Sequence, residues 1–234
     1  MMCLVIACFA TLMLVRTECA APRLRQGVAL QLPDSRESDA EPIKPIGTLS
    51  ELFDAYGGLK SFSATFREKK HMSVLLRPLA SEGQVNYDAA TKSFSQHVDK
   101  PFPYTLVLLP EYVGKLEDGS WSAFEGEIHL MVRQVLDSFL KLLEGDREGM
   151  MKLYAAKFST DAIDSTRWTV TLVPRNEPLS RVLSRVTISG RGREIIDMEV
   201  REASGDRRIM TFSNVKIDKA YSAKERLRFF PKPK

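Results

Sequence analysis

The sequence predicts a mainly β fold of the α+β class, in which one strongly curved antiparallel sheet is covered by helices. Three observations lead to this prediction. Many segments between residues 62 and 215 alternate apolar and polar side chains, as strands with one buried face do. Short turns join these segments, and short connections can join only antiparallel neighbours. A further segment, residues 127–144, is apolar at helical spacing around most of its circumference, so it must be covered on several sides.

The first elements follow in order from residue 48. Thr48 followed by Glu51 forms a capping-box pattern, and Gly57-Gly58 stops the helix that it starts. From Phe62 the pattern changes to a period of two and continues to Leu76, which predicts one long strand with a wet face. The apolar positions on which this prediction depends are Phe62, Ala64, Phe66, Met72, Val74 and Leu76. Further strands are expected at residues 83–87, 93–98, 104–109 and 112–116, with the turn Glu117-Asp118-Gly119 before Trp121.

The second half repeats this scheme after the long helix. Gly145 ends the helix, and a turn is expected at residues 146–149. Four strands are expected at residues 167–173, 182–189, 194–201 and 207–215. Their connections contain turn residues, so the strands form a meander.

Composition and charge limit the function classes. The chain has 234 residues, 44% of them hydrophobic and 27% charged, which is typical of one globular domain with tails. Its three cysteines, Cys3, Cys8 and Cys19, all precede residue 20, so Cys-based zinc sites, iron–sulfur clusters and internal disulfides are excluded from the body of the chain. A net charge of +4 with scattered basic residues argues against nucleic-acid binding.

The N-terminal segment has the pattern of an export signal. The apolar run of residues 3–15 is too short to span a bilayer, and Cys19 and Ala21 have the spacing that signal peptidase requires. We therefore expect a signal peptide at residues 1–21, a mature chain that starts near Ala21 or Pro22, and a periplasmic location. The alternative is a lipid anchor on Cys8, since Val5-Ile6-Ala7-Cys8 resembles a lipobox. Residues 22–47 are expected to be a flexible linker rich in proline and acidic residues, 48–230 the folded domain and 231–234 a basic tail.

No pattern of catalytic or metal-binding residues is found. His71, His97 and His129 are isolated, and His71 and His97 fall on polar strand positions, where a solvated surface histidine is expected. Gly190-Arg191-Gly192 fits a hairpin turn better than a phosphate-binding loop. The sequence therefore predicts a protein that is not an enzyme, with no catalytic residues, no metal and no cofactor.

The order of several short motifs resembles the outer-membrane lipoprotein carrier family (LolA-like). The resemblance spans about residues 49–218 and rests on the runs at residues 62–69, 76–87, 100–103, 142–146, 168–174 and 205–212. It implies an open half-barrel of antiparallel strands covered by helices, with an apolar hollow that holds the acyl chains of lipoproteins. It also implies a monomer that takes its lipoprotein or lipid cargo from an inner-membrane donor complex and passes it to an outer-membrane acceptor.

The sequence departs from this family at one position. Many members have an arginine just after the strand that matches residues 84–87, and that arginine closes the empty cavity. Here the segment is Asp88-Ala89-Ala90-Thr91-Lys92, and Lys92 is the nearest basic residue and the candidate gate. A lysine cannot supply the bidentate hydrogen bonds of an arginine.

Candidate cavity-lining residues come from the strands and from the long helix. They are Phe66, Val85, Tyr87, Phe94, Met131, Val135, Phe139 and Trp168. The alternative for each of them is ordinary core packing. Two other functions stay open: a carrier of a glycolipid or pigment-like lipid for a dedicated exporter, and a non-enzymatic envelope scaffold that binds a protein partner.

Overall fold

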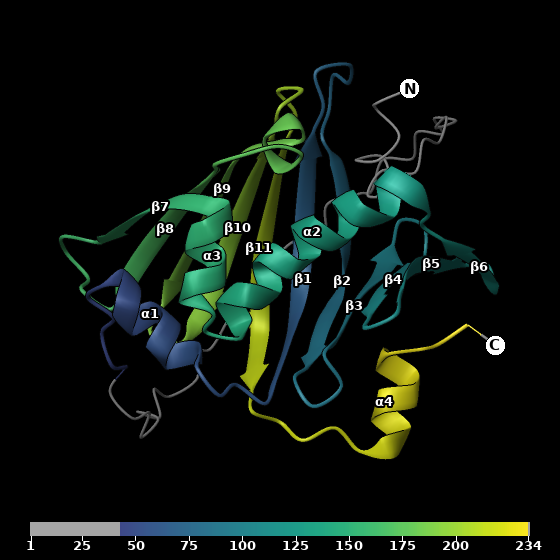
Figure 1. The fold of residues 1–234 in the computed structure, drawn as a ribbon, viewed down its shortest axis with the longest axis horizontal. Helices are drawn as coiled ribbons and strands as arrows, with labels where there is room; N and C mark the ends of the chain where they lie inside the picture. Colours follow the sequence, from purple (N-terminus) through teal and green to yellow (C-terminus); the bar gives the residue numbers. More distant parts are fainter. Residues whose placement is uncertain (1–42, 234) are drawn as a thin grey trace, which may run out of the picture.

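The computed structural model describes residues 43–233, apart from the side chains at positions 127, 128, 130, 131 and 134 (Figure 1). The predicted signal peptide and residues 22–42 of the predicted linker lie outside the described residues. Residues 43–47 have no regular structure, but Ile46 is buried in the core.

The centre of the fold is one antiparallel sheet of 11 strands in the order β6-β5-β4-β3-β2-β1-β11-β10-β9-β8-β7. The outermost strands, β6 and β7, do not pair with each other, so the sheet stays open. The predicted fold class is confirmed. The strands are β1 Ser61–His71, β2 Leu79–Asp88, β3 Ser93–Lys100, β4 Tyr104–Leu109, β5 Tyr112–Glu117, β6 Ser120–Ala123, β7 Tyr154–Thr160, β8 Arg167–Pro174, β9 Leu183–Arg191, β10 Glu194–Glu202 and β11 Arg207–Ile217.

Helices cover both faces of this sheet. On one face, α2 (Gly126–Leu143) runs obliquely across the strands, with α1 (Leu49–Tyr56) and α3 (Arg147–Leu153) beside it (Figure 1). The main hydrophobic core lies on this face and includes Leu106 and Leu108 of β4. The alternate residues Val107 and Leu109 point to the other face, where they form a second cluster with Tyr221 and Phe230 at the two ends of α4 (Ala223–Phe229).

The predicted start of the first helix is confirmed with one difference. The Thr48 hydroxyl accepts a hydrogen bond from the backbone N–H of Glu51 at 3.2 Å, as in a capping box. The Glu51 carboxylate, however, accepts from the backbone N–H of Gly47 at 2.8 Å rather than from that of Thr48. The cap therefore extends the ordered chain back to Gly47.

The prediction that the first strand continues to Leu76 was wrong. β1 ends at His71, which pairs with Arg207, the first residue of β11, so no neighbouring strand is left on that side beyond this point. Met72, Val74 and Leu76 lie instead in the loop that leads to β2, and Val74 and Leu76 are exposed. Alternation along one segment cannot show where its partner strand stops.

The turn predicted at residues 146–149 was also wrong. Asp146 caps helix α3, and its carboxylate accepts from the backbone N–H of Gly149 at 2.8 Å. Helix α3, strand β7 and helix α4 were not predicted. The two helices have only 7 residues each, too few turns to show a helical period, and the sequence of β7, YAAKFST, does not alternate regularly between apolar and polar residues.

His97 is not the solvated surface histidine that was expected. Its ring Nε2 lies 2.9 Å from the carbonyl oxygen of Phe229, and its Nδ1 lies 3.0 Å from the Thr105 hydroxyl. Burial lowers the pKa of His97. The sequence pattern placed His97 on the outer face correctly, but helix α4 covers that face. His71 is half-buried at the end of β1, and the His129 ring lies 3.0 Å from the Phe124 carbonyl oxygen.

Candidate functional site

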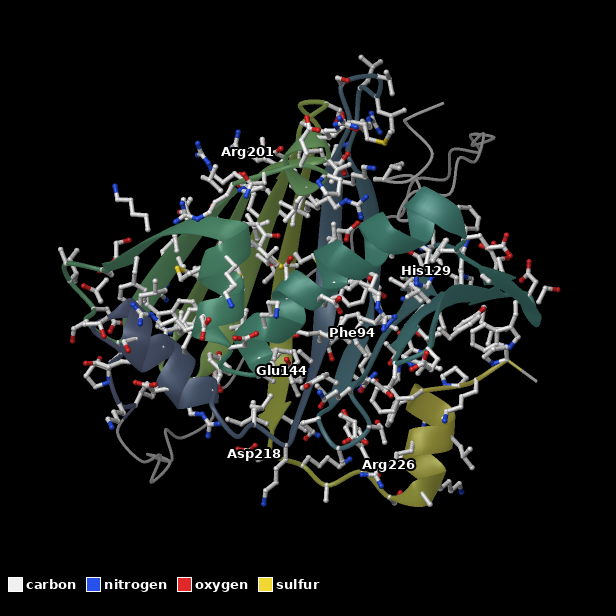
Figure 2. All side chains as sticks on the ribbon, in the orientation of Figure 1. Phe94, His129, Glu144, Arg201, Asp218 and Arg226 are labelled. Carbon is white, nitrogen blue, oxygen red and sulfur yellow. The ribbon has the colours of Figure 1, made fainter. Side chains whose placement is uncertain are left out.

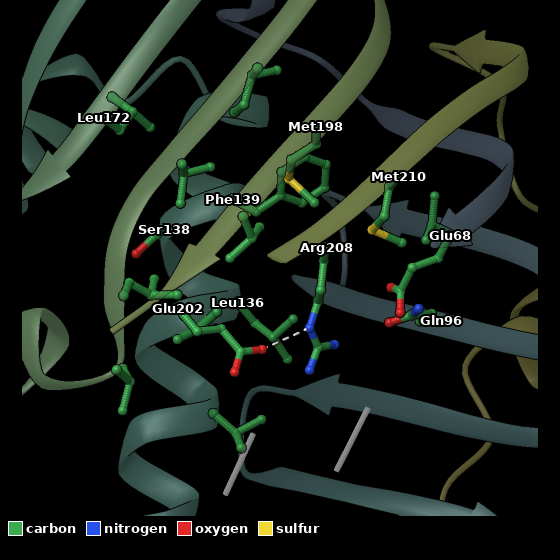
Figure 3. Close-up of a pocket in the computed structure, with 18 of the residues that line it drawn as sticks. Glu68, Gln96, Leu136, Ser138, Phe139, Leu172, Met198, Glu202, Arg208 and Met210 are labelled. Atoms are coloured by element: carbon green, nitrogen blue, oxygen red, sulfur yellow. Dashed lines mark hydrogen bonds and ion pairs between the residues drawn. The ribbon is translucent and has the colours of Figure 1, made fainter. Parts of the chain in front are cut away.

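An apolar cavity of about 150 Å³ lies between helix α2 and the sheet (Figure 3). Strands from both halves of the sheet contribute to its wall, and α2 contributes residues from successive turns. The apolar side chains that line it are Val85, Phe94, Val132, Val135, Leu136, Phe139, Leu172, Val182, Leu183, Val186, Ile188, Met198, Val200, Met210 and Phe212. The helix that the sequence showed to be apolar on several sides therefore faces both the core and a hollow.

The structure brings together four of the residues that were predicted to line a cavity. Val85 and Phe94 reach it from β2 and β3, and Val135 and Phe139 from α2. Phe139 also packs edge-to-face on Phe94, with ring centroids 6.1 Å apart. The side chain of Met131 lies outside the described residues.

Three other predicted residues are buried but are not among those that line this cavity. Phe66 is part of the main core. Trp168 donates its indole N–H to the carbonyl oxygen of Gly192 at 2.8 Å. Tyr87 donates its hydroxyl to the carboxylate of Glu144 at 2.9 Å. For these residues the structure shows packing and hydrogen bonding.

The volume of the cavity decides what it can hold in this conformation. An engineered protein cavity of about 150 Å³ binds benzene. The space under α2 is of the same size, so it admits a short stretch of hydrocarbon but not several complete acyl chains. A larger ligand requires α2 to move away from the sheet.

Hydrogen bonds hold α2 near its middle and at its C-terminal end. Arg133, in the first half of the helix, donates from both terminal nitrogens to the carbonyl oxygen of Leu109, each at 3.3 Å, and also donates to that of Pro110. At the C-terminal end lies Glu144, which directly follows α2 (Figure 2). Its carboxylate accepts the hydrogen bond from Tyr87 on β2. Burial and the Glu144 carboxylate raise the pKa of Tyr87, so its hydroxyl stays a donor.

Lys92, the candidate gate, lies in the turn between β2 and β3 with a positive φ of 48°. Its side chain is exposed and has no ion pair or side-chain hydrogen bond among residues 43–233. Its role as a gate stays a prediction. Arg133 was not predicted, since an arginine on the polar stripe of a helix has no sequence signal that separates a tether from a solvated side chain.

One part of the cavity wall is polar and charged. Glu68 on β1, Glu202 on β10 and Arg208 on β11 line it (Figure 3). Lys70 on β1 is not among the lining residues but contacts Glu202. Glu202 accepts from Arg208 Nε at 3.1 Å and lies 3.7 Å from the Lys70 ammonium group. All four side chains are buried.

The sequence of β1 carries a signal for this cluster, although the cluster was not predicted. Glu68 and Lys70 stand in the same register as Phe62, Ala64 and Phe66, which point to the core. Charged residues at the inward-facing positions of a strand lie either at its solvent-exposed end or inside the protein, where they need partners. Here Glu68 and Lys70 are buried. Burial raises the pKa of Glu68 and lowers the pKa of Lys70.

Among the described residues, no group of three His, Cys, Asp or Glu side chains is placed to hold a metal ion. None of the helices between residues 43 and 233 combines the length and the hydropathy of a membrane span.

Comparison with known proteins finds similarity only at the level of solved structures. No protein-family model matches the chain, and no curated protein does. A LolA superfamily protein from Nitrosomonas europaea is 10% identical with a TM-score of 0.42, and the match covers 80% of this chain and 99% of that one. The lipoprotein LppX from Mycobacterium tuberculosis is 12% identical with a TM-score of 0.42 over 75% and 99% of the two chains.

A third similar structure is the complex of MucA and MucB from Pseudomonas aeruginosa. It is 10% identical with a TM-score of 0.41, and the match covers 74% of this chain but 56% of that one. This chain therefore spans little more than half the length of the chain that it matches in that complex. Similarity at these values does not identify a ligand.

Proposed function

We propose that this protein is a periplasmic, non-enzymatic carrier that holds an acyl chain of a lipoprotein, or another hydrophobic cargo, under helix α2. The observation that carries the proposal is the apolar cavity between α2 and the sheet. The order of sequence motifs, which resembles the lipoprotein carrier family, supports the same function. On this proposal an inner-membrane donor loads the protein and an outer-membrane acceptor unloads it.

The small volume of the cavity suits a carrier that must release its cargo. Each buried methylene contributes about 0.8 kcal/mol, so a wide, dry and preformed cavity would hold a long chain almost irreversibly. Moving α2 to admit the chain breaks the hydrogen bonds of Arg133 and Tyr87, and this conformational cost lowers the net affinity. Binding is then strong enough for transport and weak enough for transfer.

The proposal is tested by truncating a cavity residue on α2 and measuring uptake of a fluorescent acyl probe. We expect Phe139→Ala to change probe affinity severalfold and to cost less than the ~2–5 kcal/mol typical of a packed core site. The reason is that one side of Phe139 faces the hollow rather than packed neighbours. Leu143→Ala is the matched control on the same helix, because Leu143 is fully buried and does not line the cavity.

The urea midpoint and the probe affinity are measured together on both variants. Leu143→Ala should lose the full core stability and keep its affinity per folded molecule. The proposal would be contradicted if Phe139→Ala also lost the full core stability and kept its affinity per folded molecule, and if Val135→Glu did not fold. A carboxylate at position 135 is tolerable only in a cavity that admits water.

A separate prediction concerns the tether of α2. We expect Arg133→Met to accelerate probe uptake by about tenfold, because the variant loses charge-assisted hydrogen bonds to the carbonyl oxygens of Leu109 and Pro110. Stopped-flow fluorescence measures the rate. Lys92→Met is the control, since Lys92 has no such contact, and equal rates in the two variants would show that Arg133 does not hold the helix closed.

A further inference from the structure

The connection between β1 and β2 projects from one end of the sheet and exposes several apolar side chains (Figure 1). Val74 and Leu76 are 79% and 106% exposed, and Leu75 and Leu79 are each 39% exposed. Single apolar side chains on a surface are ordinary, but a run of neighbours on a protruding segment marks an interaction site. We call residues 72–79 the apolar loop.

Two hydrogen bonds set the direction of the apolar loop. The backbone N–H of Leu75 donates to the carbonyl oxygen of Met72 at 3.0 Å and closes a turn. The backbone N–H of Ser73 donates to the carboxylate of Asp206 at 3.1 Å, in the connection between β10 and β11. The loop therefore presents its apolar side chains beside the ends of β10 and β11 rather than folding them onto the core.

A row of basic residues crosses the sheet at the same end. His71, the residue before the apolar loop, pairs with Arg207 on β11. Arg207 pairs with Arg201 on β10, which lies toward this end of the molecule, and Arg201 pairs with Arg185 on β9 (Figure 2). Directly paired residues share a face, and the next residue along each of these three strands lines the cavity, so the arginines lie on the opposite, outer face. We call Arg185, Arg201 and Arg207 the arginine row.

Acidic side chains compensate only part of the charge of this row. Glu199 pairs with Arg201 at 2.6 Å. Asp206 is partly buried, and its charge also acts on a buried lysine of β1. Arg185 and Arg207 form no ion pair within residues 43–233. Like charges directly opposite each other destabilise a sheet, so an anionic surface that contacts the row would remove a cost that the free protein carries.

The cavity reaches this end of the sheet as well. Leu183 and Glu202 line it, and they are the first residue of β9 and the last residue of β10. A surface that contacts the apolar loop would therefore lie next to the cavity.

We propose that the apolar loop and the arginine row dock the protein on the surface of a bilayer that contains anionic lipids. Val74, Leu75 and Leu76 enter the boundary between head groups and acyl chains, while Arg185 and Arg207 contact lipid phosphates. The inference goes beyond the proposed function, since it assigns the surface that meets the membrane whatever the cavity holds.

The shape of the apolar loop favours a bilayer over a protein partner. Consecutive side chains of a turn point in different directions, and those of Val74 and Leu76 are the most exposed in the loop. A flat protein surface would cover one side of such a protrusion, whereas lipid molecules surround it. Basic side chains beside the apolar tip match the negative surface potential of an anionic bilayer.

Flotation with lipid vesicles tests this surface on the full chain. One set of vesicles contains phosphatidylcholine alone, and the other also contains about 30% phosphatidylglycerol, which is anionic. We expect about 10- to 100-fold tighter binding to the anionic vesicles, because each arginine near a negative surface adds attraction. Raising the salt concentration to about 0.5 M should remove most of this preference.

A loop variant tests the apolar contact. Val74→Ser combined with Leu76→Ser should weaken binding to the anionic vesicles at least about tenfold, because two apolar side chains are no longer buried among lipids. Both positions are exposed, so this variant should keep the urea midpoint of the unaltered chain. Ile163→Ser is the matched control, since Ile163 is 99% exposed and lies between β7 and β8, at the opposite end of the strands.

An arginine variant tests the electrostatic contact. Arg185→Gln combined with Arg207→Gln should reduce the preference for anionic vesicles to less than about fivefold. Lys60→Gln combined with Lys216→Gln is the control, because it removes the same charge from exposed positions at the opposite end of β1 and β11. An equal loss in the two variants would show that total charge attracts the vesicles and would overturn the role of the arginine row.

The remaining outcomes separate this inference from the carrier function. Anionic-vesicle binding that survives the loop variant would place the membrane contact elsewhere in the chain and overturn the assignment. A chain that floats with neither kind of vesicle would also overturn it and leave a protein as the partner of the apolar loop. Uptake of the acyl probe should stay unchanged in both variants, because none of the four altered residues lines the cavity. A chain that docks through the loop but takes up no probe would contradict the carrier and keep the docking surface.

Discussion

Replacing Glu202 by leucine is expected to destabilise the protein by about 3–5 kcal/mol, because the carboxylate that both buried cations contact is lost. Lys70 and Arg208 would then stay enclosed without the carboxylate that forms an ion pair with each of them. The free energy of unfolding is measured in urea, with tryptophan fluorescence as the signal.

Glu199→Leu on the same strand is the matched control. Glu199 pairs with Arg201 at 2.6 Å, but both side chains are partly exposed, so this pair is worth at most about 1 kcal/mol. A loss of at most about 1 kcal/mol in the free energy of unfolding of both variants would contradict this prediction. It would show that water solvates Lys70 and Arg208 when Glu202 is removed.

A second large effect is expected from filling the cavity. Val200 lines it from β10, and Val200→Trp places an indole in the space that an acyl chain would occupy. Probe affinity should fall at least tenfold, which corresponds to about 1.4 kcal/mol. Stability should fall by less than the ~1–3 kcal/mol that overpacking costs, because the added atoms enter an existing hollow.

Glu199→Trp adds the same group at the neighbouring position of β10, whose side chain points to the opposite face of the sheet. This control should keep the affinity of the unaltered chain. A Val200→Trp variant that folds, loses several kcal/mol of stability and still binds the probe normally would show that Val200 is ordinary core and that the ligand lies elsewhere.

The sequence predicted those parts of the fold that have a long and regular pattern. The strand at residues 104–109 and the 18-residue helix α2 were predicted within one residue of their bounds, since period two and helical spacing are each repeated several times there. Helix α3 was missed because Asp146 to Gly149 has the composition of a turn, and only the hydrogen bond from the Gly149 N–H shows that it starts a helix.

The candidate site was predictable only in part, for a geometric reason. Val85, Phe94, Val135 and Phe139 could be named because a curved sheet under an apolar helix must enclose its inward-facing residues. The other side of the cavity comes from β8 to β11, and no local pattern shows which of their inward side chains surround a hollow and which pack closely.

The charged cluster shows the same limit. Glu68 and Arg208 are 140 positions apart by their numbers, and the register of β1 with β11 brings their strands together. Register is fixed by long-range pairing, so a sequence pattern could place Glu68 on the inner face of its strand but could not provide its neighbours.

Native mass spectrometry of the full chain, isolated from the cell envelope under mild conditions, tests the central claim most directly. We expect a population that carries the mass of an acyl-chain ligand, and we expect this population to be absent from the Val200→Trp variant isolated in the same way. A chain that carries no lipid, or the same lipid in equal amount in both proteins, would contradict the claim that the cavity under α2 is a cargo site.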